Sequence, residues 1–156
     1  VCSSDLISIF AQQGCPNIVV DVVGYFEGGD LIGETGFVGV APHRLLDTRE
    51  AGQGPCVNGV RTLTVTGGTT TIPTNATAIS VNLTAVGASL PGYLTAYPAG
   101  GLRPTVSNLN YTPGSVTPNG AIVTIGAGGQ IDLYGQQGCP NVIVDVFGYF
   151  VGPTPT

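Results

Sequence analysis

The stretch Ala78-Ile-Ser-Val-Asn-Leu-Thr-Ala-Val86 decides the fold class, because its apolar and polar side chains alternate without a break. A period of two places each set of side chains on its own face of an extended strand. The apolar face carries Ile79, Val81, Leu83 and Ala85, and the polar face carries Ser80, Asn82 and Thr84. This pattern predicts a β-strand with one face buried and the other facing solvent.

Short apolar runs on either side of this strand alternate with turns rich in Gly, Pro and Asn, and none of them has a helical period. We expect further strands at residues 60–66, 92–97, 107–111, 121–125, 131–134 and 141–150. We expect turns at residues 66–68, 97–101 and 117–120, and a hairpin turn at residues 126–129. Such a series predicts an all-β fold, an antiparallel β-sandwich or barrel of the jelly-roll kind.

A twenty-residue segment occurs twice in the chain. Residues 7–26 and 131–150 are identical at thirteen of twenty positions, at an offset of 124. Self-similarity at a fixed offset is typical of a tandem array. We therefore expect the terminal hairpin of a preceding repeat at 1–26, a linker at 27–36, a complete β-domain at 37–150 and a Pro/Thr linker at 151–156. Residues 1–6 resemble the translation of a sequencing adapter, and we expect no function of them.

The chain is poor in charge. Charged residues make up 8% of the sequence, about a third of the usual share, and the formal net charge is −5 with four Arg and no Lys. Nucleic acids and anionic membranes require clustered Lys or Arg, so we expect neither as a partner. No apolar run reaches 18 residues, so we expect no membrane insertion.

Cysteine positions predict one disulfide. Cys15 and Cys139 are equivalent positions of the duplicated segment, and Cys56 is the only other cysteine of the complete repeat. We expect Cys56 and Cys139 to be bridged, which implies an oxidising compartment. Cys15 is then free, bonded to Cys2 or linked to another chain. The chain has no C-x-x-C spacing and only one His, so we expect no metal site and no cofactor.

The last expected strand, residues 141–150, is apolar on both faces, which is typical of a central strand. Its Asp145 places a carboxylate among apolar side chains, where an unpaired charge is costly. Arginine satisfies such a carboxylate through two parallel hydrogen bonds. We expect Asp145 to be buried and paired with Arg44 or Arg49 as a structural clasp.

Five segments of the chain resemble, in the same order, secreted bacterial repeat modules that open with an RLLDTR-like segment and close with DVxGYF. They are Arg44-Leu-Leu-Asp-Thr-Arg49, Asn82-Leu-Thr-Ala-Val86, Gly92-Tyr-Leu-Thr-Ala-Tyr-Pro98, Pro104-Thr-Val-Ser-Asn-Leu-Asn-Tyr111 and Asp145-Val-Phe-Gly-Tyr-Phe150. Such modules are frequent in actinobacteria, in tandem or joined to extracellular hydrolases. The resemblance implies an extracellular accessory β-domain, and it carries over no catalytic or ligand-binding residue.

The sequence offers few candidate catalytic motifs, whereas one group of residues suits ligand binding. A Ser-His-Asp site would have to use His43, and the chain has no Gly-x-Ser-x-Gly, so we expect no catalytic residue. The candidate ligand-binding residues are Tyr93, Tyr97, Arg103, Asn108 and Asn110. Tyrosine rings cover the apolar face of a sugar and amides bind its hydroxyls. The alternative is that these tyrosines cap the core and the asparagines close turns.

These observations predict a non-catalytic, secreted or cell-surface repeat module. We expect it to serve as a structural, surface-display or adhesive unit of a larger extracellular protein. Residues 7–26 are expected to join neighbouring copies or other chains by strand pairing, which would produce a fibre. The alternative function is a carbohydrate-binding module attached to a secreted hydrolase, with a polysaccharide as its ligand.

Overall fold

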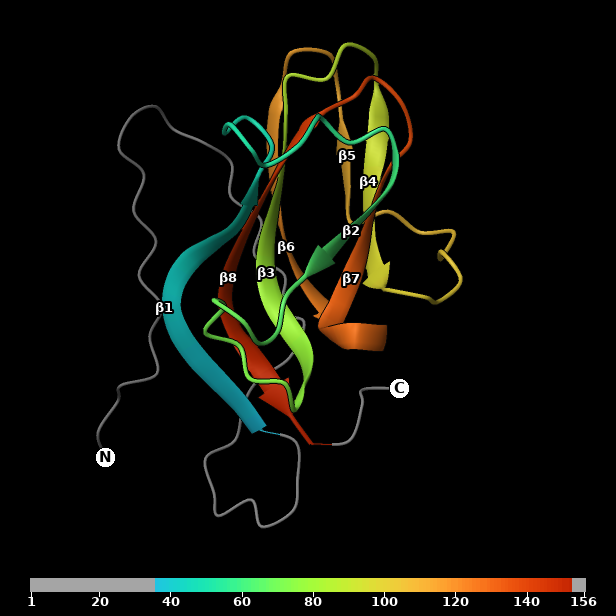
Figure 1. The fold of residues 1–156 in the computed structure, drawn as a ribbon. Helices are drawn as coiled ribbons and strands as arrows, with labels where there is room; N and C mark the ends of the chain where they lie inside the picture. The colour runs from blue at the N-terminus through green and yellow to red at the C-terminus, as the bar shows by residue number, and fades with distance from the viewer. Residues whose placement is uncertain (1–35, 153–156) are drawn as a thin grey trace, which may run out of the picture.

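Eight strands and one short 3-10 turn are present in residues 36–152, the part of the chain described by this computed structural model (Figure 1). The strands are β1 (Gly36–Asp47), β2 (Gly59–Thr64), β3 (Ala76–Val86), β4 (Gly92–Pro98), β5 (Leu109–Tyr111), β6 (Val116–Thr124), β7 (Gln130–Gly135) and β8 (Asn141–Val151). The turn η1 (Ala127–Gly129) lies between β6 and β7.

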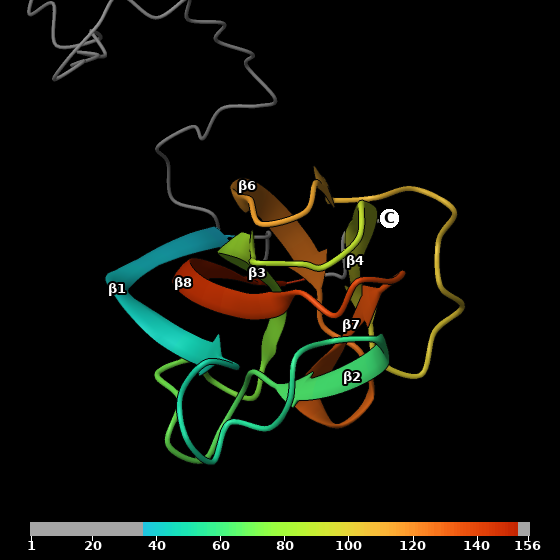
Figure 2. The same cartoon turned by 90° about the horizontal axis from the view of Figure 1, so that it is seen from above.

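The strands form two antiparallel sheets that pack face to face (Figure 2). We call the sheet with strand order β1-β8-β3-β6 sheet A, and the sheet with order β2-β7-β4-β5 sheet B. Consecutive strands lie in different sheets, except β4 and β5, which are neighbours in sheet B. This is the winding of an eight-stranded jelly roll. The all-β sandwich predicted from the sequence is confirmed, and the barrel alternative is wrong.

The hydrophobic core lies between the two sheets. The apolar side chains of β3 point into it as predicted: Ile79, Val81, Leu83 and Ala85 are each at most 1% exposed. Leu94 and Leu133 contribute to the same core from sheet B, and both are fully buried. The strict alternation of β3 is therefore the pattern of a strand that covers the core with one face only.

The second copy of the duplicated segment forms β7 and β8, which lie in different sheets. β7 pairs with β2 and β4, whereas β8 pairs with β1 and β3, so each is an inner strand of its own sheet. The central position predicted for residues 141–150 is confirmed. β7 and β8 do not pair as a hairpin, because residues 136–140 cross from one sheet to the other. The first copy, residues 7–26, lies outside the described residues.

The expected strands omitted β1. Its pairing with β8 shifts register twice, between Gly39 and His43 and between Arg44 and Leu46. Each irregularity breaks the alternation of inward and outward side chains, so no period of two is visible in the sequence. β1 also lies at the edge of sheet A, where many of its side chains remain exposed.

Two expected turns differ in the structure. Residues 117–120 belong to β6, where Pro118 pairs with Thr84. Sheet A ends at β6, and an edge strand tolerates proline because one side of its backbone makes no ladder bonds. Residues 126–129 do not close a hairpin within one sheet, because they carry the chain from β6 in sheet A to β7 in sheet B.

Cys56 and Cys139 form the expected disulfide, with their Cα atoms 5.2 Å apart. The bridge joins the loop after β1 to the crossing before β8, so it links two connections between the sheets. Next to the bridge, the Val57 backbone N–H donates a hydrogen bond of 2.9 Å to the Pro140 carbonyl and joins the same two loops.

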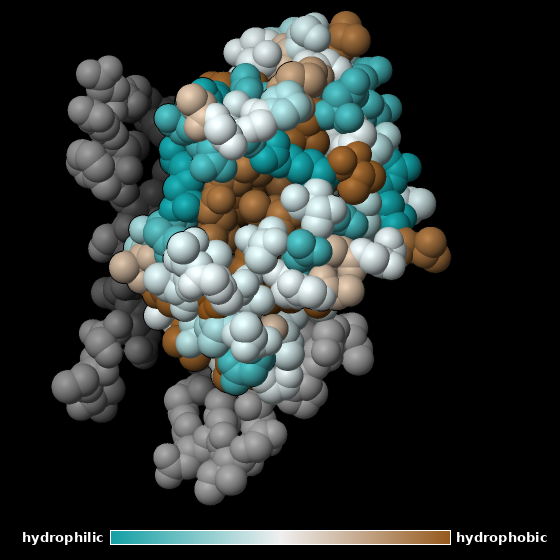
Figure 3. Space-filling model, viewed as in Figure 1, coloured by the Kyte–Doolittle hydropathy of each residue, from teal (hydrophilic) through white to brown (hydrophobic). Residues whose placement is uncertain are grey.

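Much of the surface in Figure 3 is polar or near-neutral, and apolar atoms gather in a hollow in the middle of this side. Single apolar residues elsewhere are strongly exposed, among them Leu102 at 97%. Within residues 36–152, no helix is long and apolar enough to cross a membrane.

Replacing both Cys56 and Cys139 with Ser should lower the free energy of unfolding by about 2–4 kcal/mol, because the bridge restricts an 83-residue span of the unfolded chain. Urea unfolding under non-reducing conditions measures the loss. The matched control replaces Cys2 and Cys15 with Ser and should leave the midpoint unchanged. A double variant of Cys56 and Cys139 as stable as the parent would contradict a stabilising role of the bridge.

Candidate functional site

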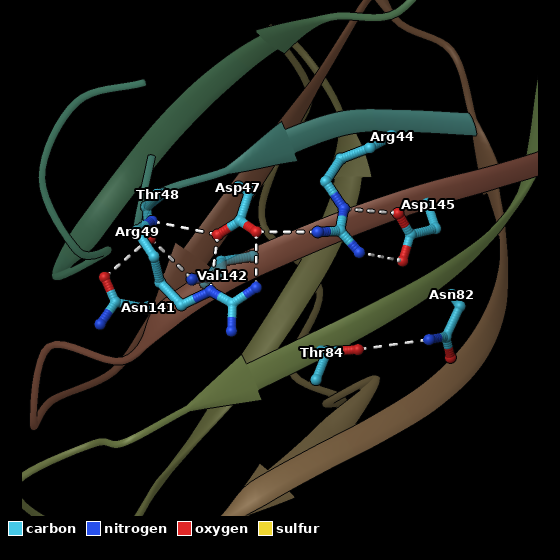
Figure 4. A network of polar contacts seen from close by, with 9 residues as sticks. All are labelled: Arg44, Asp47, Thr48, Arg49, Asn82, Thr84, Asn141, Val142 and Asp145. Carbon is cyan, nitrogen blue, oxygen red and sulfur yellow. Dashed lines mark hydrogen bonds and ion pairs between the residues drawn. The ribbon is translucent and has the colours of Figure 1, made fainter. Parts of the chain in front are cut away.

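The densest polar network of the described residues surrounds Asp47, at the end of β1 (Figure 4). The Asp47 side chain is only 2% exposed, yet it carries a carboxylate. Arg49 donates to both oxygens, from Nε at 2.8 Å and from a terminal nitrogen at 2.6 Å, and the Arg49 backbone N–H donates at 3.1 Å. Arg44 adds a fourth hydrogen bond at 2.9 Å. The charge is therefore fully paired where it is buried.

Thr48 attaches the same segment to the start of β8. Its hydroxyl donates to Asn141 at 3.0 Å and accepts the backbone N–H of Val142 at 2.9 Å. The Thr48 backbone N–H in turn donates to the Val142 carbonyl at 3.1 Å. These bonds extend the pairing of β1 with β8 beyond the last residue of β1.

Asp145 pairs with Arg44, whose Nε lies 2.9 Å from one carboxylate oxygen and whose terminal nitrogen lies 3.3 Å from the other. The expectation that Asp145 is buried is wrong: its side chain is 25% exposed. Its neighbours Val144 and Val146 point into the core, so Asp145 points away from sheet B. Arg49 binds Asp47 rather than Asp145. The buried acid of the clasp is Asp47, which the sequence analysis did not select.

Electrostatics follow from this geometry. Hydrogen bonds from Arg49 lower the pKa of the Asp47 carboxyl from 3.8 to about 2, against the opposing effect of burial. Hydrogen bonding to Asp145 raises the pKa of the Arg44 guanidinium above its usual value. Two guanidinium groups and two carboxylates balance one another, so the network has no net charge.

The predicted ligand cluster divides into buried and accessible members. Tyr97 is 5% exposed, and its burial raises the pKa of its phenol. Asn108 accepts the backbone N–H of Ala96 at 2.7 Å, so its amide oxygen holds the loop after β4 in place. Both residues serve the fold, as the alternative interpretation proposed. Asn110 is exposed and accepts a hydrogen bond from Ser107 at 3.1 Å.

Tyr93 and Arg103 are brought together by a residue that the sequence analysis did not select, Tyr134 of β7. The Tyr93 and Tyr134 ring centroids lie 6.0 Å apart, and the Arg103 guanidinium lies 3.8 Å above the Tyr134 ring. A cation at this distance is attracted to the face of the ring. Strand β7 neighbours β4, and Thr95 pairs with Tyr134, a pairing that no local sequence pattern reveals.

His43 and Asp132 both make hydrogen bonds within the fold. The half-buried His43 ring lies 3.2 Å from the Thr71 hydroxyl and contacts the Ala41 carbonyl. Asp132 is 8% exposed and accepts a hydrogen bond of 2.6 Å from Thr62. Residues 36–152 contain no group of three or more His, Cys, Asp or Glu side chains placed to hold a metal ion.

Replacing Asp47 with Ala should destabilise the protein by about 2–4 kcal/mol, because four hydrogen bonds to a charged group are lost. Replacing Asp145 with Ala should cost under about 1 kcal/mol, since its ion pair is solvated. Chemical denaturation of the two variants gives the comparison. Equal losses would show that Asp47 is not the centre of the network.

Acid should weaken the same network. Because the folded-state pKa of Asp47 is depressed, its stabilisation is complete above about pH 4 and disappears as the pH falls from about 4 to about 2. The slope of unfolding free energy against pH in this window should be shallower in Asp47→Asn than in the parent protein. Thermal unfolding followed by circular dichroism between pH 2 and pH 6 measures both slopes, and identical slopes would contradict the assignment.

No protein-family model matches this chain, and no curated protein and no solved structure matches it either.

Proposed function

We propose that this chain is a non-catalytic module of an extracellular protein, and that it displays its faces and loops to the side of a tandem array. The Cys56–Cys139 disulfide supports the oxidising compartment. The duplicated segment supports the array, because residues 7–26 repeat the sequence of the two inner strands of the jelly roll.

The observation that carries the proposal is the position of the two ends of the sandwich. Gly36 at the start of β1 pairs in register with Val151 at the end of β8, so the chain enters and leaves at the same place (Figure 1). A spacer that lengthens a stalk requires its ends on opposite sides. With adjacent ends, successive modules project from the line of the array, and the disulfide-bridged loops point away from the joints.

The charge network supports a structural role for the residues that resemble the RLLDTR-like segment. Arg44, Asp47 and Arg49 use their charges on one another and on Asp145. Catalytic acids and bases need an available proton site facing a substrate, whereas the carboxylate of Asp47 is enclosed by guanidinium groups. The segment therefore acts as a fastening between β1 and β8 in this proposal.

Single-molecule pulling tests the display geometry. Force applied between residues 36 and 151 would separate β1 from β8 one pair at a time, because these strands are antiparallel neighbours with adjacent ends. Force applied between residues 36 and 89 would load many ladder bonds together. We expect a lower unfolding force for the first attachment, with thermal unfolding as a check that both attached proteins are folded. An equal or higher force would favour a load-bearing spacer instead.

Carbohydrate binding is the second candidate function, favoured by the ring pair of Tyr93 and Tyr134 with Arg103 beside it. The Arg103 guanidinium covers one face of Tyr134, which leaves Tyr93 and the exposed Asn110 as the groups for a ligand. A sugar bound there would lose its contact in Tyr93→Ala.

A further inference from the structure

An aromatic side chain lies on the outer face of sheet A, beside a β-bulge in an inner strand. Along β3, Val81 pairs with Val146 and Ser80 pairs with Gly148, so Phe147 has no residue opposite it. The register with β1 also jumps over Phe147, from His43 opposite Val146 to Gly39 opposite Gly148. Phe147 is 39% exposed in the middle of the sheet. Bulges are over-represented beside functional sites.

Two hollows meet at Phe147. The first, of about 420 Å³, is lined by Pro42, His43, Arg44, Asp145 and Phe147. The second, of about 330 Å³, is lined by Ser80, Val81, Gly120, Ala121, Ile122 and Phe147. Together they extend across all four strands of sheet A, from β1 to the edge strand β6, with the aromatic ring between them.

Glycine keeps the second hollow open. A methyl group built at Gly120 would meet no atom within 4 Å, so the missing side chain leaves open space rather than filling a tight contact. Gly120 pairs with Asn82, which in turn pairs with Asp145 across β3 and β8. These three residues lie side by side across the sheet, and they lead from the open space at Gly120 to the ion pair of Asp145 with Arg44.

The polar groups around Phe147 favour a ligand without net charge. Arg44 and Asp145 neutralise each other, and they present a guanidinium edge and carboxylate oxygens side by side (Figure 4). Asn82, whose amide donates to Thr84 at 3.2 Å, alternates with the inward Val81 and Leu83 and so belongs to the same outer face. Donors and acceptors that alternate around an aromatic ring match the hydroxyls and the apolar face of a sugar.

We propose that the outer face of sheet A binds a neutral polysaccharide, with Phe147 stacked against one pyranose ring and neighbouring rings in the two hollows. Arg44, Asp145 and Asn82 bind the hydroxyl groups. The ligand class rests on the carbohydrate-binding candidate above, whereas the site is a different one, on the opposite sheet from Tyr93. An array of modules would then present several such grooves to one polymer, which strengthens weak individual binding.

Affinity electrophoresis of the full chain tests the site, with soluble xylan, β-1,3-glucan and mannan each cast in a native gel. Phe147→Ala should weaken the retardation by about tenfold or more in apparent affinity, because the stacking surface is lost. Gly120→Gln should also weaken it, since the new side chain occupies the second hollow. Leu102→Ala is the matched control and should bind like the parent protein, because this exposed side chain lies outside both candidate sites. Tyr93→Ala separates binding at sheet A from binding at the Tyr93 site.

Thermal unfolding and light scattering accompany each variant, so that a folding defect or a change of oligomeric state is recognised. Gly120→Gln retains Phe147, so it still tests polysaccharide binding in the groove if Phe147→Ala does not fold. Absence of retardation by all three polysaccharides would overturn the proposal, as would binding that persists in both groove variants or that is lost in Tyr93→Ala. A dimer that dissociates in Phe147→Ala would assign the groove to a second copy and overturn it also. None of these outcomes alters the pulling result, which tests the display geometry separately.

Discussion

Two arginines hold the carboxylate of Asp47 at the end of β1, where the chain leaves sheet A for sheet B. β1 is an edge strand with two register shifts, so its ladder to β8 is interrupted. The ion pairs of Asp47 and the hydrogen bonds of Thr48 attach the C-terminal end of β1 to β8 and so compensate for the interrupted ladder. Without this attachment, β1 would be the easiest strand to detach, and Val144 and Val146 of β8 would lose cover on that side.

The same network also shapes the outer face of sheet A. Arg44 reaches Asp47 with one nitrogen and Asp145 with two others, so the buried fastening and the surface ion pair share one guanidinium. That sharing fixes the Arg44 and Asp145 side chains beside Phe147 at little further entropic cost. A binding groove built on groups already held by the fold is preorganised, and Phe147 supplies the apolar surface that the network lacks.

Strand connectivity makes the proposed display role compatible with the proposed groove on sheet A. In this jelly roll β1 and β8 are neighbours, so both ends of the module lie at one end of sheet A. The groove crosses the strands between those ends and the disulfide-bridged loops. A polymer bound in the proposed groove would therefore run across the strands of sheet A.

The sequence by itself determined the fold class, the inward face of β3, the inner position of β8 and the Cys56–Cys139 pair, because alternation, apolar runs and cysteine counts are local or compositional signals. Only the tertiary structure decided which acid is buried. Asp47 has Arg44 and Arg49 close to it in sequence, whereas Asp145 is far from any arginine in the chain. Which of the two acids is buried depends on which side of each strand faces the second sheet. The separation of β7 from β8, the bulge beside Phe147 and the approach of Tyr134 to Tyr93 were likewise beyond sequence reasoning, since each depends on pairing between strands distant in the chain.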